Sequence, residues 1–417
     1  MTTRLDHSIG DALFDRAQRV IPGGIYGHQT PAFLVAGAFP KFLSAAHGCR
    51  VVDPDGHQYI DFMCAYGPMV LGYGDPVVEA AAERQRRLCD VGTLPAPVMV
   101  ELAEKLVDIT TGMDWAMFAK NGSDGCTWSI AVAREATGRD MVAMVGGSYH
   151  GVHGWCNAFQ RGFPDGERAT VLTFSWNDAA SLERLFAAHH GKIAAVMITP
   201  FRHEGMHDSE LPTREFLDSV RRQCTSNGAV MIVDDVRAGF RINIGGSLQH
   251  WGVTPDMTVY SKAVANGYPL AVLLGADSLR TPAQGVFYTG TFATQAVPLA
   301  ASLATIEQLI VRDAIVHMDR VGRRLCNGLA QRASAAGLAV TLSGPPSIPF
   351  MTFVADDGGF DRSRTFSAEC AGRGAFFHPH HNWFVSMAHS DADIDAALAI
   401  AEVGFAQVLA EHGADQA

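Results

Sequence analysis

Between residues 60 and 309, short apolar runs alternate with longer stretches of helical periodicity, and this alternation restricts the fold more than any other feature. The short runs are continuously apolar, which is typical of strands buried on both faces of a sheet. We expect strands at residues 115–118, 141–145, 170–173, 194–198, 230–233, 257–260 and 270–274. We expect helices at residues 98–109, 127–137, 179–188, 213–227 and 298–309. The pattern predicts an α/β fold with a mostly parallel sheet covered by helices on both faces.

The two ends of the chain have a different pattern. Residues 1–59 contain one helical stretch, at 9–20, followed by turns rich in glycine and proline. The last part of the chain contains helical stretches with short strand candidates between them, at residues 314–336, 339–342, 349–354 and 391–411. We therefore predict an N-terminal arm that belongs with a small domain, a large domain, and a smaller C-terminal α/β domain, at residues 1–59, 60–309 and 310–417.

The overall composition argues against several classes of protein. Hydrophobic residues make up 48% of the 417 residues and charged residues 18%, as in an ordinary folded chain. A net charge of −11 without a long run of lysine or arginine argues against nucleic-acid or membrane partners. No segment approaches the roughly 20 apolar residues that span a bilayer, and the N-terminus lacks the pattern of a signal peptide. The eight cysteines form no CxxC pair, so we expect reduced thiols and a cytoplasmic protein.

The first motif with chemical meaning is Lys120-Asn-Gly-Ser-Asp-Gly125, between a predicted strand and a predicted helix. A glycine-containing turn at a helix N-terminus presents free backbone N–H groups and the positive end of the helix dipole, and both favour a phosphate group. An ordinary helix cap has the same pattern, so this motif alone leaves both interpretations open.

The second motif places two adjacent carboxylates, Asp234 and Asp235, at the end of the predicted strand 230–233. Open α/β sheets bind their ligands at the carboxyl ends of the strands. A carboxylate there could hold a metal, act as a base, or pair with a protonated ring nitrogen. Alternatively, one of the pair caps the next turn.

The third motif places Lys262 just after the predicted strand 257–260, with Gly267 and Pro269 following shortly. A lysine in such an apolar setting loses solvation, which lowers its pKa and makes the neutral amine available for Schiff-base chemistry. The commoner alternative is an exposed lysine at a turn.

The three motifs together are more specific than any one of them. In chain order they provide an anion site, a partner for a ring nitrogen and an amine that can react with an aldehyde, which is what pyridoxal 5′-phosphate (PLP) requires. Tyr149, in Gly147-Ser-Tyr-His-Gly151, follows another predicted strand and could stack on the pyridine face. A nucleotide-binding α/β protein is a rival, but no G-x-G-x-x-G turn follows a strand.

The order of motifs resembles the class III aminotransferases, in the subgroup that contains glutamate-1-semialdehyde aminomutase. The matching markers are Ile21-Pro-Gly-Gly24, Tyr66-Gly-Pro68, Thr137-Gly-Arg139, Tyr149-His-Gly151, Gly239-Phe-Arg241 and Ala388-His389. Less generic motifs are similar to the amine aminotransferases that degrade hydrolysed fumonisin. They include Met63-Cys-Ala-Tyr-Gly-Pro68, Thr199-Pro-Phe-Arg-His-Glu204 and Ala265-Asn-Gly-Tyr-Pro269.

This resemblance implies a PLP enzyme of fold type I, a homodimer with active sites at the subunit interface and a large domain that binds the cofactor. It implies that Lys262 forms the Schiff base and moves protons, and that Asp234 pairs with the pyridinium nitrogen. The remaining implied cofactor contacts are Val236 and Tyr149 on the two ring faces, Asn121, Gly122 and Ser123 at the phosphate, and Thr291 at the phosphate of the neighbouring subunit.

One departure from the subgroup concerns the substrate. The aminomutases carry an arginine soon after the Ile-Pro-Gly-Gly turn to bind the substrate carboxylate, whereas residues 25–33 contain none. We therefore expect a transaminase that moves an amino group from a primary amine, long-chain and polyol amines included, to a small keto acid such as pyruvate. An aminomutase or epimerase is the alternative. Arg202 and Arg237 are the candidate carboxylate partners, and Tyr26 and Tyr66 the candidate pocket residues.

Histidines suggest a further alternative. His378, His380 and His381 resemble a metal-binding tract, and His150 and His153 are also close in sequence. A single run broken by proline cannot close a metal site by itself. We expect these histidines to line the core or the pocket, and we expect no metal site.

Overall fold

The computed structural model of the chain describes residues 5–26, 31–157, 159, 161–204, 207–356 and 358–415. The chain forms two compact units, which interleave along the sequence. The first unit comprises Met1–Asp75, Gly205–Ser209 and Val316–Ala417. The second unit comprises Pro76–Glu204 and Glu210–Ile315. The boundaries predicted at residues 59/60 and 309/310 stay predictions.

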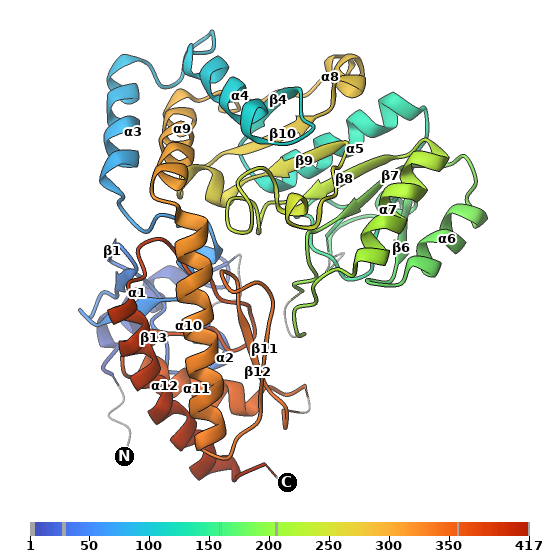
Figure 1. The fold of residues 1–417 in the computed structure, drawn as a ribbon. Coiled ribbons are helices and arrows are strands. Elements are labelled where there is room, and N and C mark those ends of the chain that lie inside the picture. The colour runs from blue at the N-terminus through green and yellow to red at the C-terminus, as the bar shows by residue number, and fades with distance from the viewer. Residues whose placement is uncertain are drawn as a thin grey trace. The chain divides into compact units, whose positions relative to one another are not determined.

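Within the described residues, the second unit contains a seven-stranded sheet with the order β4-β10-β9-β8-β7-β5-β6 (Figure 1). The strands are β4 (Trp115–Ala119), β5 (Met141–Val145), β6 (Val171–Phe174), β7 (Ile193–Ile198), β8 (Val230–Asp234), β9 (Met257–Tyr260) and β10 (Ala271–Gly275). The five strands β6, β5, β7, β8 and β9, in their order across the sheet, pair in parallel. Strand β10 is antiparallel to both of its neighbours, β9 and β4. The predicted α/β fold with a mostly parallel sheet is confirmed.

Helices cover both faces of this sheet. The helices of the second unit are α3 (Pro76–Leu88), α4 (Val98–Ile109), α5 (Gly122–Thr137), α6 (Ala179–Ala188), α7 (Arg214–Asn227), α8 (Arg280–Gly285) and α9 (Ala296–Val311). On one face α5 packs against residues such as Ile232 and Val259, and on the other α6 and α7 pack against residues such as Met231 and Val233. Every residue of β7 and β8 is buried, so their continuous apolar runs follow from burial on both faces.

Helix α5 begins five residues earlier than expected. The sequence predicted a helix from residue 127, whereas α5 starts at Gly122. The side chain of Asn121 caps this helix, with its Oδ1 accepting a hydrogen bond from the Asp124 backbone N–H at 3.1 Å. The start of α5 therefore lies directly after β4, within the motif predicted to bind a phosphate.

The first unit joins the two ends of the chain. It contains α1 (Ser8–Gln18), α2 (Pro31–Leu34), β1 (Ala45–His47), β2 (Arg50–Val52), β3 (Gln58–Asp61), β11 (Val340–Ser343), β12 (Phe350–Phe353), α11 (Asp361–Ala371), β13 (Ala375–Phe376), α12 (Asp391–His412) and most of α10 (Ala314–Ala335). Its described residues form a four-stranded sheet of order β1-β2-β3-β13, in which β13 pairs in parallel with β3. Leu325 of α10, Phe366 of α11 and Phe405 of α12 contribute to one buried core with Ile60 of β3.

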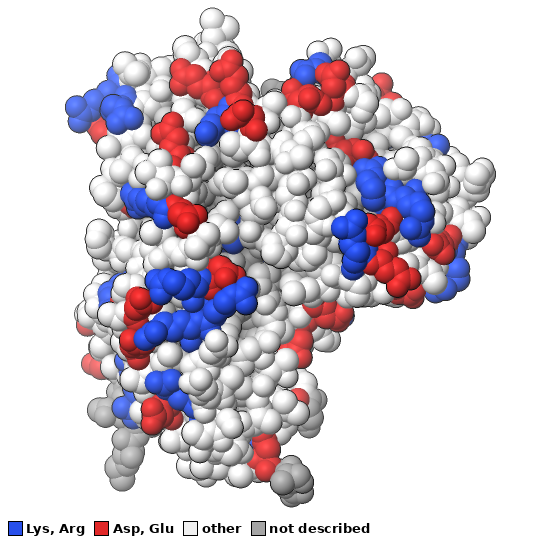
Figure 2. Space-filling model, viewed as in Figure 1, with Lys and Arg blue, Asp and Glu red and all other residues white. Residues whose placement is uncertain are grey.

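Charged side chains of both signs lie close together over α7 and around α10 (Figure 2). Arg214 pairs with Asp218 along α7 at 2.9 Å, and Arg323 pairs with Asp319 along α10 at 2.6 Å. Exposed pairs of this kind contribute little to stability, because water screens the two charges. In the part of the chain that the structure describes, no helix is long and apolar enough to cross a membrane.

Candidate active site

The three chemical motifs lie in the second unit, each at the carboxyl end of a strand of the seven-stranded sheet. Asp234 is the last residue of β8, and Lys262 follows β9 after a single intervening residue. Strands β8 and β9 are adjacent and parallel, with Asp234 in register with Val259. The charge of Asp234 also acts on the Lys262 amine. The sheet topology therefore places the carboxylate and the amine of the sequence motifs at one site.

Lys262 has an unusual backbone and an unusual amine. Its φ of 50° lies in the left-handed region, which side chains other than glycine rarely adopt. The short helical turn that it opens is fixed by Ser261 Oγ, which donates to Leu270 O at 2.7 Å, and by Ser302 Oγ, which donates to Val264 O at 2.8 Å. Burial, and next the positive charge of Arg237, lower the pKa of Lys262 to about 7. Much of the amine is therefore neutral near neutral pH, as a nucleophile requires.

Asp234 is oriented by a histidine. Its Oδ2 lies 2.7 Å from His150 Nδ1, and its Oδ1 accepts a hydrogen bond from the Val236 backbone N–H at 3.1 Å. His150 is 2% exposed, and its Nε2 has no hydrogen-bonding partner among the described residues. In the sequence, His150 was noted as part of the marker Tyr149-His-Gly151 and as a histidine close to His153, and its contact with Asp234 was not predicted. Its position next to Tyr149, in a loop that follows a strand, was the available signal.

The two adjacent carboxylates point to different partners. Asp235 is buried and accepts hydrogen bonds from the Ser247 backbone N–H at 2.8 Å and from Ser247 Oγ at 2.6 Å. Burial raises the pKa of Asp235 to about 7 against the opposing effect of Ser247, and the charge of Asp234 adds to the increase. Asp235 therefore holds the turn at Ser247. Of the two adjacent acids, Asp234 is the one whose carboxylate belongs to the candidate active site.

The predicted phosphate turn forms the first turn of α5. The Asn121 side chain is engaged in capping, since its Nδ2 also donates to Asp124 Oδ2 at 2.7 Å. The remaining donors are the backbone N–H groups of the first helical turn, at Gly122 and Ser123, which α-helices leave without intrahelical partners. A Cβ at Gly122 would lie 2.9 Å from Val236 Cγ2, so only glycine allows this close approach. Ser123 Oγ accepts a hydrogen bond from the Val152 backbone N–H at 3.2 Å.

These residues fit PLP. A partly neutral amine, a strand-end carboxylate held by a buried imidazole and a helix N-terminus follow the carboxyl ends of β9, β8 and β4, three strands of one sheet. Gly151 also approaches Ser123 so closely that a Cβ would meet Ser123 Oγ at 2.4 Å. The loop that carries Tyr149 is thereby held against the start of α5.

Comparison with known proteins identifies the family. The model of the family described as aminotransferase class-III matches residues 35–340. The chain belongs to the class III aminotransferases.

The chain is similar to aminotransferases over nearly its whole length. It is 41% identical over 404 residues to the aminopentol aminotransferase of Sphingopyxis macrogoltabida, covering 97% of this chain and 95% of that protein. It is 32% identical over 401 residues to the 3-aminobutyryl-CoA aminotransferase of Cloacimonas acidaminovorans (strain Evry), covering 94% of this chain and 96% of that protein. The solved PLP internal aldimine form of the FumI protein of Sphingopyxis sp. MTA144 superposes with a TM-score of 0.95 at 40% identity, covering 98% of both chains.

These findings confirm several predictions. This class III aminotransferase uses PLP, has the fold of type I enzymes and catalyses amino-group transfer. The resemblance to the amine aminotransferases of fumonisin degradation is likewise confirmed. The roles of individual residues stay predictions.

The two candidate arginines of this aminotransferase have different surroundings. Arg202 is held by two glutamates, with its Nε donating to Glu204 Oε2 at 3.0 Å and its Nη1 to Glu210 Oε1 at 2.8 Å. Arg237 Nη1 donates to the His203 backbone carbonyl at 3.1 Å. Burial lowers the pKa of Arg237 to about 10, while the charges of Asp234 and Glu204 oppose this effect. Arg237 is therefore the arginine whose charge reaches the Asp234 and Lys262 groups.

The predicted ring and phosphate contacts of the aminotransferase are placed as follows. Tyr149 is 45% exposed, and burial of the rest of the side chain raises its pKa. Val236 is partly buried and packs against the core beneath α5. Thr291 is exposed, in a turn that precedes α9. Its predicted contact requires a second subunit and stays a prediction.

Tyr26 and Tyr66 lie in the first unit. Tyr26 is 83% exposed. Tyr66 places its ring 5.4 Å from the ring of His381, nearly perpendicular to it, and burial raises its pKa to about 12. Their predicted contacts with the substrate stay predictions.

The histidines at 378, 380 and 381 form hydrogen bonds within their own loop and with helix α11. His378 Nδ1 accepts a hydrogen bond from the His380 backbone N–H at 3.0 Å, and His380 Nε2 accepts one from Arg364 Nε at 3.2 Å. His381 Nδ1 lies 2.6 Å from the Asn382 backbone carbonyl. One nitrogen of each of these three rings is thus used to shape the loop. His153 Nδ1 lies 2.6 Å from Thr127 Oγ1, away from the tract in sequence.

Proposed function

We propose that this aminotransferase moves the amino group of a primary amine, long-chain and polyol amines included, to a small keto acid such as pyruvate. The observation that carries the proposal is the position of Arg237 close to the reactive groups. Its positive charge lowers the pKa of Lys262, and the charge of Asp234 opposes the effect of burial on the pKa of Arg237. Such a cation suits the carboxylate of a keto acid. The likeness to a protein named aminopentol aminotransferase supports a polyol amine as the donor.

When bound, PLP supplies an aldehyde that takes up the amino group and a ring that accepts electrons from the adjacent carbon. Lys262 Nζ, with its pKa of about 7, would take a proton from the substrate carbon and return it to the neighbouring carbon of the cofactor. Asp234, held by His150 at 2.7 Å, would keep the ring nitrogen protonated. The site would thus provide both the base and the charge partner from neighbouring strand ends.

The remaining residues would bind and orient the cofactor and substrates. Asn121, Gly122 and Ser123 would hold the phosphate at the start of α5. Tyr149 and Val236 would flank the ring, and Tyr26 and Tyr66 would line the substrate pocket. Thr291 would reach the phosphate of a neighbouring subunit.

Glu204 would allow one site to accept both substrates. An amine donor lacks a carboxylate, so Arg237 needs another negative partner in that half-reaction. The charge of Glu204 already acts on Arg237 and raises its pKa. Glu204 itself is held by Ser148 Oγ at 3.2 Å and by Arg202 Nε at 3.0 Å. We propose that the keto acid carboxylate takes over from Glu204 as the partner of Arg237.

A half-reaction screen tests this function. The purified holoenzyme is mixed with single amine donors, namely long-chain amines, polyol amines and α-amino acids, and the visible absorbance of the lysine-bound cofactor is followed. We expect a long-chain or polyol amine to bleach this absorbance and pyruvate to restore it. Bleaching by α-amino acids alone would contradict the proposed donor class. Turnover that proceeds without any keto acid would indicate an aminomutase or epimerase instead.

We also propose a cytoplasmic homodimer with active sites at the subunit interface. All eight cysteines lie in the described ranges and none of them forms a disulfide there, which supports a reducing compartment. Large apolar side chains of the second unit are exposed, among them Leu88 at 81%, Val311 at 77% and Phe287 at 89%. Exposed apolar surface of this kind supports burial against a second subunit. Light scattering after size-exclusion chromatography would measure the mass, and a monomer would contradict the dimer.

A further inference from the structure

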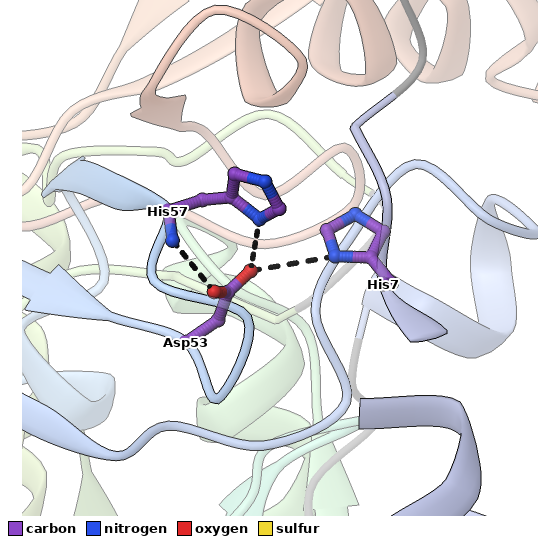
Figure 3. Close-up of side chains that lie close together, drawn as sticks. All are labelled: His7, Asp53 and His57. Carbon is purple, nitrogen blue, oxygen red and sulfur yellow. Dashed lines mark hydrogen bonds and ion pairs between the residues drawn. The ribbon is translucent and has the colours of Figure 1, made fainter. Parts of the chain in front are cut away.

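Three side chains of metal-binding type converge in the first unit, far from the predicted histidine tract in sequence. Figure 3 shows His7 and His57 pointing at the carboxylate of Asp53 from two sides. His57 Nδ1 lies 2.9 Å and His7 Nδ1 lies 3.3 Å from Asp53 Oδ2. One nitrogen of each imidazole and one carboxylate oxygen all lie within 4.8 Å of one another.

The cluster is enclosed, and one of its members lacks a hydrogen bond. The Asp53 side chain is 0% exposed and the His7 side chain 9%, while the His57 side chain is 26% exposed and forms the open side. Both ring nitrogens of His7 are buried, and neither has a hydrogen-bonding partner among the described residues. A buried polar group without such a partner destabilises the folded state. The arrangement therefore calls for a ligand at His7.

The carboxylate of Asp53 is prepared to carry a negative charge. Its Oδ1 accepts a hydrogen bond from the His57 backbone N–H at 2.8 Å, and its Oδ2 accepts one from the Tyr59 hydroxyl at 3.0 Å. Burial alone would raise the pKa of Asp53, but the hydrogen bonds from His57 and Tyr59 outweigh it and lower the pKa. Metal-binding carboxylates are commonly held by outer hydrogen bonds of this kind.

We propose that His7, Asp53 and His57 bind one divalent transition-metal ion, for which Zn²⁺ is the best match. Two imidazoles and one carboxylate are ligands that Zn²⁺ accepts, with a water molecule as the fourth. Zn²⁺ bonds of about 2.0–2.2 Å in a tetrahedron separate the ligand atoms by roughly 3.3–3.6 Å. The 2.9 and 3.3 Å separations around Asp53 Oδ2 are close to this spacing, so binding requires only small side-chain shifts.

The ion would occupy the position between the rings and the carboxylate. Each imidazole would bind it through the Nδ1 lone pair and carry its proton on Nε2, so binding displaces any Nδ1 proton to solvent. The hydrogen bonds from the His57 backbone and from Tyr59 would remain and orient the carboxylate. The water ligand would lie on the His57 side, which is open to solvent.

The site would fix the N-terminal helix of the first unit. His7 immediately precedes α1, and the turn between β2 and β3 carries both Asp53 and His57. Asp55 of the same turn already accepts hydrogen bonds from the Ile9 backbone N–H at 2.7 Å and the Gly10 backbone N–H at 2.9 Å. A metal bound at His7 would tie the start of α1 to this turn a second time. No metal site was predicted from the sequence, because only histidines that are close in sequence were weighed as ligands there.

Metal content tests the site without reference to activity. Untagged holoenzyme is treated with chelator, loaded with Zn²⁺, freed of excess metal and analysed for zinc per chain. We expect about one zinc per chain in the wild-type enzyme, and a loss of about tenfold or more in His7→Gln and in His57→Gln. The matched control is His47→Gln, because His47 is an exposed histidine of β1 in the same unit. Equal zinc content in wild type and His7→Gln would overturn the proposal, as would wild-type enzyme without zinc.

Cobalt provides a second measurement that does not depend on a variant that folds. Co²⁺ bound by two imidazoles, a carboxylate and water gives ligand-field bands in the visible spectrum, whereas hydrated Co²⁺ absorbs far more weakly. We expect these bands to appear in the wild-type holoenzyme with one equivalent of Co²⁺ and to be displaced by Zn²⁺. Their absence would overturn the proposal even if the histidine variants prove unstable.

Discussion

The imidazole of His150 holds the carboxylate of Asp234, with Nδ1 2.7 Å from Oδ2, at the end of the central strand β8. His150 comes from the loop after β5, and Asp234 ends a strand 84 residues later. The contact fixes one oxygen of Asp234, while the Val236 backbone N–H fixes the other. A carboxylate held at both oxygens is ready to meet a ring nitrogen without rearranging.

Replacing His150 by Ala should lower kcat/KM about ten- to hundredfold, because a buried hydrogen bond to a charged group is worth about 1.5–3 kcal/mol. The spectrum of the bound cofactor should also change its pH dependence, since Asp234 would hold the ring nitrogen less firmly. Steady-state kinetics and absorbance against pH measure the two effects. His190→Ala, at an exposed histidine after α6, is the control. An unchanged spectrum in His150→Ala would argue against this role.

Lys262 should show its lowered pKa when the cofactor is reintroduced. In the cofactor-free enzyme, the rate of PLP capture should rise with pH up to about 7 and then level, because the neutral amine reacts and its pKa is about 7. A lysine of ordinary pKa would keep gaining rate up to pH of about 10. Stopped-flow absorbance measures the rate at each pH. Lys262→Ala should show no such phase and should lose turnover by a factor of at least about 10².

Arg237→Gln should separate the two half-reactions. The keto acid half-reaction should weaken about ten- to hundredfold, through loss of charge-assisted hydrogen bonds worth about 1.5–3 kcal/mol. The amine half-reaction should change much less, because an amine donor brings no carboxylate. Single-turnover rates against pyruvate and against amine concentration measure each half separately. Arg222→Gln is the control, since Arg222 is an exposed arginine of α7 that pairs with Glu183. Equal losses in both half-reactions of Arg237→Gln would contradict the assignment.

Gly122 lies so close to Val236 that a side chain at position 122 should disturb PLP binding, and a smaller side chain at position 236 should relieve the effect. Gly122→Ala adds a Cβ 2.9 Å from Val236 Cγ2 and should weaken PLP binding, because either the start of α5 or the Val236 loop must move. Combining it with Val236→Ala removes the clash and should restore part of the affinity. Equilibrium dissociation of PLP from wild type, both single variants and the double variant measures this coupling. Strictly additive effects would show that the contact does not shape the site.

The sequence allowed the central sheet to be predicted because its strands are buried on both faces. The run predicted at 194–198 corresponds to β7, whose six residues are all buried. In the first unit, β11 and β12 correspond to the runs predicted at 339–342 and 349–354, whereas β1 was missed for the opposite reason. All three residues of β1 are exposed, so no apolar pattern marks them. Helix α3 was also missed.

The site was predicted in part for similar reasons. Asp234 and Lys262 follow apolar strands, so their positions at the sheet edge could be inferred from local pattern. The contact between His150 and Asp234 depends on the order of strands in the sheet, which no local pattern contains. The contact between His7 and Asp53 spans 46 residues and depends on how α1 packs.

The pairing of β13 with β3 has a consequence for how the chain is made. Ala375 pairs with Ile60, so the sheet of the first unit cannot close until almost the whole chain has left the ribosome. The second unit is nearly continuous in sequence, from Pro76 to Ile315, and can fold before that. Strands β1, β2 and β3 can pair with one another early, but the outer edge of β3 must wait for β13. A chain truncated before residue 375 should therefore expose that edge of β3 to chaperones.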